Sequence, residues 1–461
     1  MVSILIPSGI CLAVYWARFF LLKYRAGRKL PWILPLAFTC LFIPKVTLMQ
    51  VNPDHSMAGI RTDDILALVM LAVSLRDART YRNRKILIGI GFLLALSAAS
   101  LVSMFTGRAM GYDNAVPFSI LTILRKYEYF AFALIGVYMA GHTENAEKTA
   151  LAEFAWMSAF HAAIALLQVA GLCNYAVIGF LDYWDPSWAN RAISTFNGHY
   201  EYGHFLCFGI AVYLCAFLRT KKPGWLLAVA GCFGMIWLTA SRTSLIVGIL
   251  LMLLILLFSV RKNSSRAVKA GAAVCIALFV LAGALFAAGI LDLKRFAAVD
   301  LGEYAGYLRE NIEKGDLREY AQMVRQGIEE STVVAGEIAD ADAGARFFKW
   351  GAALDGFRQS PLFGYGSGVT EVMDGNYIKL LGEGGAAGLL LWLGMFGFFM
   401  RTVWKARGRA VPARSVFWMM VSVLIASVFI DMFEASKPME MLWLAAGLVI
   451  GLEALKTGDR E

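Results

Sequence analysis

The sequence predicts an all-α protein that crosses a lipid bilayer many times. The chain has 461 residues, of which 59% are hydrophobic and only 17% are charged, whereas about 25% of the residues in soluble domains are charged. Several apolar runs reach about 20 residues, the length of a helix that spans the hydrocarbon core. The formal net charge of +9 would favour a nucleic-acid partner in a soluble protein, but in a membrane protein it records orientation. The composition therefore argues against a soluble enzyme, and no nucleic-acid partner is expected.

The apolar runs predict about 12 to 13 transmembrane helices, separated by polar clusters. The third run is the shortest, which leaves the expected number at 12 or 13. The predicted spans are residues 2–22, 31–49, 63–75, 86–105, 119–140, 150–171, 204–219, 224–240, 243–260, 267–289, 377–400, 415–432 and 439–454.

The connections between the spans separate by charge. Those rich in Lys and Arg fall on one side of the membrane if the spans alternate: residues 23–29, 76–85, 219–222, 261–269 and 401–414. By the positive-inside rule this side is cytoplasmic. Residues 141–150 support the assignment weakly, because Lys148 is their only Lys or Arg. An odd number of spans then places the N-terminus outside.

Two outer connections are much longer than the usual loop of about 4–6 residues. The first covers residues 171–203 and the second residues 290–376. The second has fifteen Asp and Glu against nine Lys and Arg, as a translocated segment can have, and we expect it to form a helical cap. The chain is thus divided into residues 1–289 with ten spans, residues 290–376 as the large outer loop, and residues 377–461 with three spans.

No motif indicates a cytoplasmic nucleotide or cofactor site. The sequence contains no Walker loop and no dinucleotide fingerprint, and its seven cysteines lie almost all inside apolar runs without metal-ligand spacing. We therefore expect no cofactor, and we expect any chemistry to take place on the outer face.

Three arginines on the predicted outer face are candidates for binding phosphate. Arg191 begins Arg-Ala-Ile-Ser-Thr-Phe, Arg242 lies in a tight Ser-Arg-Thr-Ser turn between two spans, and Arg346 precedes Phe-Phe-Lys-Trp. A planar guanidinium forms permanently charged, bidentate hydrogen bonds with phosphate. Arg242 is the most telling, because a charge at the membrane edge is costly unless it is paired. The alternative for Arg242 is a side chain that snorkels to the interface.

His199, Glu201 and His204 follow Arg191 closely. Their spacing differs from the H-E-x-x-H helix pattern, and no cysteine or second histidine pair accompanies them. We therefore expect no metal site there. Sugar hydrogen-bonding groups or a structural turn are the favoured interpretations.

A third region combines glycines with polar residues. It contains Pro361-Leu-Phe-Gly364-Tyr-Gly366, then Asp374-Gly-Asn-Tyr377, then Glu383-Gly-Gly-Ala-Ala-Gly388. Glycine permits the backbone to approach a ligand or another helix closely. For the glycines of residues 384–388, close packing between helices is the favoured interpretation.

In their order and spacing, these segments resemble the O-antigen ligase and polymerase superfamily of bacterial membrane glycosyltransferases, over most of the chain. Two earlier segments add to the resemblance, Arg61-Thr-Asp63-Asp64 and Arg125-Lys-Tyr-Glu128. For these, a helix cap and an i,i+3 ion pair are the alternatives. The resemblance implies a GT-C-like architecture, a multi-pass protein of the bacterial inner membrane, an active site that faces the periplasm or exterior, and no metal.

The resemblance further implies a polymerase that joins undecaprenyl-diphosphate-linked repeat units into O-antigen or exopolysaccharide. In ligases of the family, a histidine regarded as the catalytic base occupies the position that Asp374 holds here, so this departure favours a polymerase. The implied partners are the lipid-linked glycan donor and acceptor, the bilayer, and a chain-length regulator and flippase of the same pathway.

Each candidate residue has an expected role. Arg191 and Arg242 would stabilise the negative charge that develops on the diphosphate, and Asp374 is the first candidate for the base that activates the acceptor hydroxyl. Four further residues are expected to bind the substrate: Arg346, His199, Glu201 and Tyr377. Of these, His199 and Glu201 are also the next candidates for the base.

Two other functions stay open at this stage. A ligase would transfer the same glycan to the lipid A core and should carry the histidine that this chain lacks. A transporter or flippase would have broken helices and charges near the middle of the bilayer, ideally in related halves of the chain.

Overall fold

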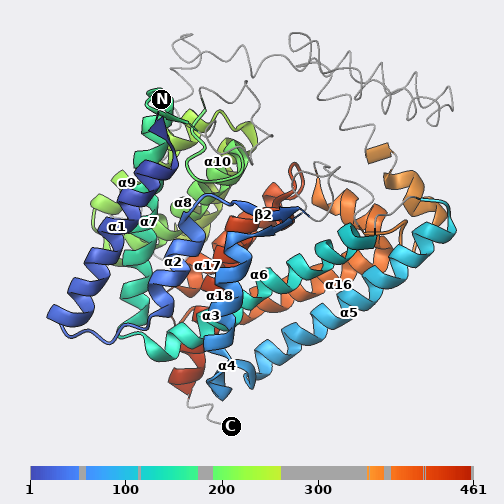
Figure 1. Cartoon of the computed structure of the whole chain (residues 1–461), viewed down its shortest axis with the longest axis horizontal. Coiled ribbons are helices and arrows are strands. Elements are labelled where there is room, and N and C mark those ends of the chain that lie inside the picture. Colours follow the sequence, from blue (N-terminus) through green and yellow to red (C-terminus); the bar gives the residue numbers. More distant parts are fainter. Residues whose placement is uncertain are drawn as a thin grey trace.

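The computed structural model describes residues 2–50, 59–112, 116–174, 191–260, 350–351, 353–367, 375–408, 410 and 412–457. These residues are almost entirely helical, with only four short strands (Figure 1), which confirms the predicted all-α fold. The predicted span 267–289 and most of the two long outer loops lie outside the described residues.

Seven helices of the described part are long and apolar enough to cross a bilayer. They are α1 (Leu5–Phe20) with its π-helical extension η1 (Leu21–Arg25), α5 (Arg84–Ala109), α7 (Ala146–Val169), α8 (His199–Thr220), α10 (Arg242–Val260), α16 (Asn376–Ala406) and α18 (Ser436–Thr457). Helix α6 (Val116–His142) is equally long but contains charged residues. Shorter helices are α2 (Ile33–Phe42), α3 (Thr62–Ser74), α4 (Ala78–Tyr81), α9 (Gly224–Thr239) and α17 (Ala413–Ala426). The chain is thus a polytopic membrane protein.

Two small strand pairs accompany the helices. Strand β1 (Val2–Ser3) pairs in parallel with β4 (Cys173–Asn174), and β2 (Thr47–Gln50) pairs antiparallel with β3 (Gly59–Arg61). Because β2 falls at the end of the predicted span 31–49, the helix there is shorter than the apolar run suggested. Helix α2 ends at Phe42, and Ile43 is extended with a ψ of 149°. Pro44 explains this end, since proline disfavours helical geometry in the residue before it.

The basic connections 23–29 and 76–85 and residues 141–150 gather at one end of the helix bundle, named the basic end here. Glu144 N donates to Lys29 O over 2.9 Å, which joins residues 141–150 to residues 23–29. Lys85 Nζ lies 2.5 Å from Glu453 Oε2 near the end of α18. Since α18 has 22 residues and an α-helix rises about 1.5 Å per residue, its first turn lies at the opposite end of the bundle. Figure 1 likewise shows the start of α1 and the end of α18 at opposite ends.

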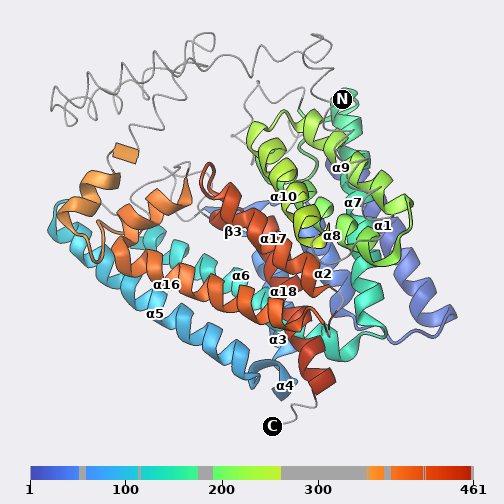
Figure 2. The ribbon, with the colours of Figure 1, turned by 180° about the vertical axis from the view of Figure 1, so that it is seen from behind.

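Glycines permit the closest helix contacts. Helices α6 and α18 approach so closely that a Cβ atom on Gly136 would overlap Leu444 O, and one on Gly447 would overlap Ala133 O. Such small-residue contacts replace the hydrophobic effect as the source of helix association in lipid. Helices α5 and α16 also run side by side (Figure 2), with Gly89 of α5 packed against the ring of Phe399 of α16.

Candidate functional site

Residues 191–199 form a buried loop, named the Arg191 loop here, that leads into α8. The two ends of the loop meet, because Arg191 Nη1 lies 3.1 Å from His199 Nε2. Between them, the residues from Ala192 to Phe196 are each at most 4% exposed. Irregular backbone at membrane depth is tolerated where protein surrounds it and satisfies its polar groups. Two predicted site residues thus lie together at the neck of an enclosed loop.

Arg242 is the first residue of α10 and follows a tight turn from α9. Ala240 ends α9 in the left-handed region with a φ of 54°, and Ser241 Oγ accepts a hydrogen bond of 3.3 Å from the backbone N–H three residues later, as a helix cap does. The Arg191 loop lies against this turn, because Ala192 N donates to Leu238 O over 2.9 Å. The structure therefore brings the two predicted phosphate-binding segments next to each other.

Glu201 and His204 follow on α8 and have different surroundings. Glu201 is 4% exposed, and the nearby positive charges include Lys45 and Lys437. His204 is fully buried, with its Nε2 atom 3.3 Å from Ser422 Oγ on α17. His199, in contrast, contacts Arg191. His199, Glu201 and His204 therefore have different neighbours and do not form one cluster.

A network of buried charges lies between α3, α6, α18 and the segment after α2. Its members are three basic and four acidic residues: Lys45, Arg61, Arg125, Asp63, Asp64, Glu128 and Glu440. We call this set the charge network. Lys45 Nζ lies 2.5 Å from both Asp63 Oδ2 and Glu440 Oε1, and all three side chains are at most 1% exposed. Since an unpaired charge in the membrane interior is costly, such groups persist where they are paired.

The helix cap and the i,i+3 ion pair, which were the local alternatives for the two early segments, are both present in the structure. Arg61 N donates to Asp64 Oδ2 over 2.7 Å, which caps the start of α3. Arg125 Nη1 lies 2.5 Å from Glu128 Oε2, the predicted i,i+3 pair, and also 2.5 Å from Asp64 Oδ1. The cap and the ion pair are therefore parts of the larger charge network.

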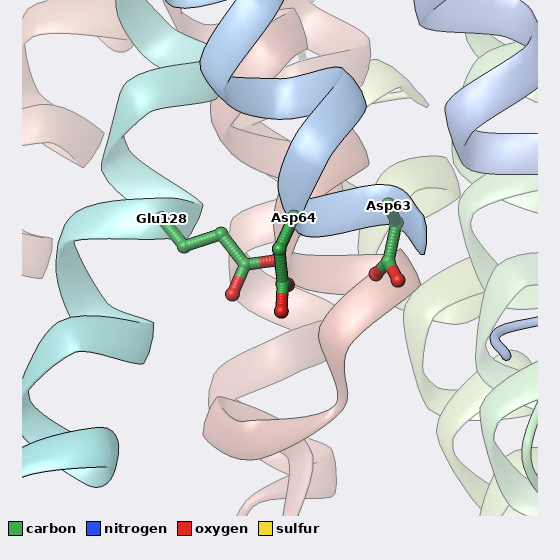
Figure 3. Close-up of side chains that lie close together, drawn as sticks. All are labelled: Asp63, Asp64 and Glu128. Carbon is green, nitrogen blue, oxygen red and sulfur yellow. The ribbon is translucent and has the colours of Figure 1, made fainter. Parts of the chain in front are cut away.

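Three carboxylates of this network lie close enough together to be considered as metal ligands. One oxygen each from Asp63, Asp64 and Glu128 lies within 4.8 Å of the others, and Figure 3 shows the carboxylates of Asp64 and Glu128 side by side. However, the Arg125 guanidinium bridges Asp64 and Glu128, and Lys45 contacts Asp63. A cation would have to displace both basic side chains, so we interpret the carboxylates as their counter-charges.

Lys437, in the first turn of α18, connects this region to the Arg191 loop. The side chain is fully buried, and its Nζ atom donates to Thr195 O over 2.5 Å and to Thr195 Oγ1 over 2.9 Å. Lys437 Nζ also lies 5.0 Å from the centre of the Phe196 ring, within the range of a cation–π contact. The middle of the Arg191 loop is thus held by a lysine of the last helix.

A second group of charges lies where α17 connects to α18 through the 3-10 turn η4 (Met432–Glu434). Lys379 Nζ of α16 lies 3.2 Å from Asp431 Oδ2 and 2.8 Å from Glu434 Oε2. Burial, and then the charge of Glu434, raise the pKa of Asp431 to about 8. The side chain of Glu434 is 43% exposed, whereas that of Asp431 is 17% exposed. Glu434 is therefore the more accessible carboxylate of this group.

The two glycine-rich motifs bind each other through their backbones. Four hydrogen bonds of 2.9–3.1 Å join them, in which Tyr365 N, Gly366 N, Ala386 N and Ala387 N donate to Gly382 O, Glu383 O, Pro361 O and Leu362 O respectively. Helix α16 is interrupted at this place, since Gly385 has a φ of 61°. A Cβ atom on Gly385 would overlap the backbone of Leu362. The favoured interpretation of this glycine as a contact between helices is therefore wrong, because it faces a non-helical segment.

The remaining predicted site residues have separate positions. Tyr377, at the start of α16, donates its hydroxyl hydrogen to Leu424 O over 2.7 Å and packs edge-on against Phe433. Asp374 and Arg346 lie outside the described residues.

Sequence reasoning missed several lysines that the structure places in buried clusters. Lys45 and Lys379 lie inside the predicted spans 31–49 and 377–400, and Lys437 lies immediately before the last one. A charge inside an apolar span is by default a candidate for function, so the signal was present. The sequence does not indicate the burial of Lys437, because this burial depends on a loop that is distant in sequence.

The helices and buried ion pairs define a polytopic membrane protein with an elaborate polar interior. Residues 226–386 match the family model described as O-antigen ligase. The match includes Arg242, the first glycine-rich motif and the second one as far as residue 386, whereas Arg191 lies before it. No curated protein matches the chain. Over residues 226–386 the predicted resemblance to the O-antigen ligase and polymerase superfamily is confirmed, and members of that family transfer glycosyl groups.

Proposed function

We propose that the protein is a polymerase that joins undecaprenyl-diphosphate-linked oligosaccharide repeat units into O-antigen or exopolysaccharide, on the outer face of the bacterial inner membrane. The observation that carries the proposal is the contact between the Arg191 loop and the Arg242 turn, through Ala192 N and Leu238 O. This contact supports a common site for a diphosphate. The match to the O-antigen ligase family supports the class of reaction.

The proposed reaction replaces one bond at the anomeric carbon of the donor by another. An acceptor hydroxyl oxygen attacks that carbon, and the bond from the carbon to the diphosphate oxygen breaks. The electron pair leaves with the diphosphate, and the hydroxyl proton passes to a base. Oriented donors in a water-poor site stabilise the charge that develops on the leaving group. Arg191 and Arg242 have this role in the proposal, and Arg346 is proposed to bind the substrate. The proposed reaction needs no metal and no nucleotide sugar.

The candidates for the base in this proposal are carboxylates and a histidine. Asp374 is the first candidate, as the residue that replaces the family's histidine. His199 is partly exposed at the neck of the Arg191 loop, whereas Glu201 is 4% exposed among basic residues. This difference favours His199 over Glu201 as the second candidate, and Tyr377 and Glu434 are proposed to contact the acceptor sugar.

The break in α16 bears on the transporter alternative, which predicted broken helices. The backbone groups at this break are paired with residues 361–366, and no second interrupted span occurs among the described helices. A symmetric pair of half-helices around a transport site is therefore not favoured. A chain-length regulator and a flippase would act beside the polymerase.

The test is a reconstitution of the purified protein with lipid-diphosphate-linked repeat units, with the products separated as a glycan ladder. Wild-type protein should give a ladder, and Arg191→Ala and Arg242→Ala should each lower the rate by about 10²-fold or more, the usual effect of removing one group that stabilises the developing charge. Arg407→Ala is the matched control, because this arginine stacks on Trp404 at the basic end of α16 and should leave the ladder intact.

Two other outcomes of the reconstitution would identify a different function. A single transfer that requires lipid A core would identify a ligase. Movement of lipid-linked glycan across the bilayer without any new glycosidic bond would identify a transporter. Either result would overturn the proposed polymerase.

A further inference from the structure

The geometry points to Gln168 and Lys437 as positioning residues that clamp the Arg191 loop and thereby fix the direction of the Arg191 guanidinium. This inference rests on the proposed function for its catalytic consequence, but the clamp itself is a property of the loop. Gln168 lies in the last turn of α7, and Lys437 lies in the first turn of α18. The loop is therefore held from two helices that are far apart in sequence.

Gln168 satisfies three backbone groups of the loop with one side chain. Its Oε1 atom accepts hydrogen bonds from Ile193 N over 3.2 Å and from Ser194 N over 2.6 Å. Its Nε2 atom donates to Ser194 O over 2.9 Å. Gln168 is 6% exposed, so these bonds are made where water does not compete. A buried backbone group without a partner costs about 1–3 kcal/mol, which makes this pairing decisive for the loop conformation.

The backbone conformation of Ser194 also depends on these contacts. This residue has a φ of 56°, in the left-handed region that a side chain disfavours. Such a conformation persists only where the surroundings determine it. Gln168 binds both sides of Ser194, and His161 Nδ1 lies 2.9 Å from Ser194 Oγ. Without these partners we expect the residue to relax, which would move the neighbouring Arg191.

Lys437 holds the next residue. It donates to the carbonyl and the hydroxyl of Thr195, and Thr195 Oγ1 donates to Phe42 O over 2.5 Å. The turn at Ser194 and Thr195 is thus attached to α2, α7 and α18, while Arg191 and His199 close the neck. Gln168 and Lys437 would then fix the direction of the Arg191 guanidinium without contacting the substrate.

The test compares Gln168→Met and Lys437→Met, which keep side-chain length but remove the loop contacts. Amide hydrogen exchange of residues 192–196 in detergent-solubilised full-length protein should accelerate in both variants. The rate constant kcat, measured per folded molecule in the ladder assay, should fall by about 10²-fold, the cost of a misplacement of about 1 Å. The KM for the lipid-linked donor should change much less. Thr402→Val is the matched control, because Thr402 Oγ1 donates to Phe398 O over 2.9 Å within α16, and none of the loop contacts described above involves α16.

A double-variant cycle separates positioning from general stability. In an Arg191→Lys background, Gln168→Met should lower kcat by much less than in wild type, because the residue it acts through is already altered. An equal fold-change in both backgrounds would overturn the inference, and so would unchanged amide exchange in Gln168→Met. A wild-type protein that forms no glycan ladder would overturn the proposed polymerase, while the exchange measurement would still decide the clamp.

Discussion

Arg125 shows how one side chain can balance several buried carboxylates. Its Nη1 atom contacts both Asp64 and Glu128, and its Nη2 atom donates to Gly59 O over 2.9 Å. The side chain is only 15% exposed. The charge network contains one more carboxylate than basic groups, so it has no spare cation to replace Arg125.

We therefore predict that Arg125→Met is strongly destabilising. Removing one partner leaves buried charges uncompensated, which costs about 3–5 kcal/mol. The temperature of thermal unfolding in detergent should fall clearly below that of wild type. Adding Glu128→Met to Arg125→Met should recover part of the loss, because it removes one orphaned charge.

The control for this prediction is Arg358→Met. Arg358 pairs with Asp355 over 2.8 Å, but its side chain is 77% exposed, and exposed pairs contribute little. An unfolding temperature for Arg125→Met equal to that of Arg358→Met would contradict the assigned role of Arg125.

Sequence reasoning reached only the local part of this network. The pair of Arg125 and Glu128 follows from their spacing on one helix, and so does the cap at Asp64. Lys45 and Glu440, however, lie on segments near opposite ends of the chain, and only helix packing brings them to 2.5 Å. The contacts of Gln168 were equally unpredictable, because they are made to backbone groups of a distant loop.

At the scale of elements, the interrupted helix α16 depends on a single glycine. Gly385 combines a φ of 61° with a Cβ direction that points into the Leu362 backbone. We predict that Gly385→Ala destabilises the protein by about 1–3 kcal/mol, from the left-handed conformation alone, and more where the overlap cannot relax. The measurement is the thermal unfolding temperature in detergent.

The neighbouring glycine offers a matched control. A Cβ atom on Gly384 would have no atom within 4 Å, so Gly384→Ala should be close to neutral. If the two variants were equally stable, the pairing of α16 with residues 361–366 would not have the geometry described.

Element boundaries followed from the sequence where one physical effect dominates. The apolar run 86–105 corresponds to α5, and the run 150–171 to α7, because hydropathy alone decides a span. The run 31–49 was too long, since Pro44 ends the helix although hydrophobicity continues. The break at Gly385 could not be separated from helix packing by sequence, because both uses require a small residue.

At the scale of the whole molecule, the distribution of charge predicted which connections share a side. Lys29 N donates to Glu144 Oε2, and His142 Nε2 lies 3.7 Å from Asp77 Oδ2, so three of these connections meet at the basic end. The weak assignment of residues 141–150 gains support from the first contact. The charge pattern alone could not show this, because Lys148 is the only Lys or Arg of that segment.

The sidedness of the membrane domain can be tested with single cysteines in a variant that lacks the seven native ones. Lys148 and Lys222 are exposed and belong to connections predicted to be cytoplasmic. Arg108 is exposed near the other end of α5, about 35 Å from the start of that helix at about 1.5 Å per residue. In intact cells freed of the outer-membrane barrier, a membrane-impermeant maleimide should therefore label Arg108→Cys, whereas Lys148→Cys and Lys222→Cys should react only after the membrane is permeabilised. Labelling of Lys148→Cys from outside would place the basic end outside and would remove the proposed periplasmic position of Arg191 and Arg242.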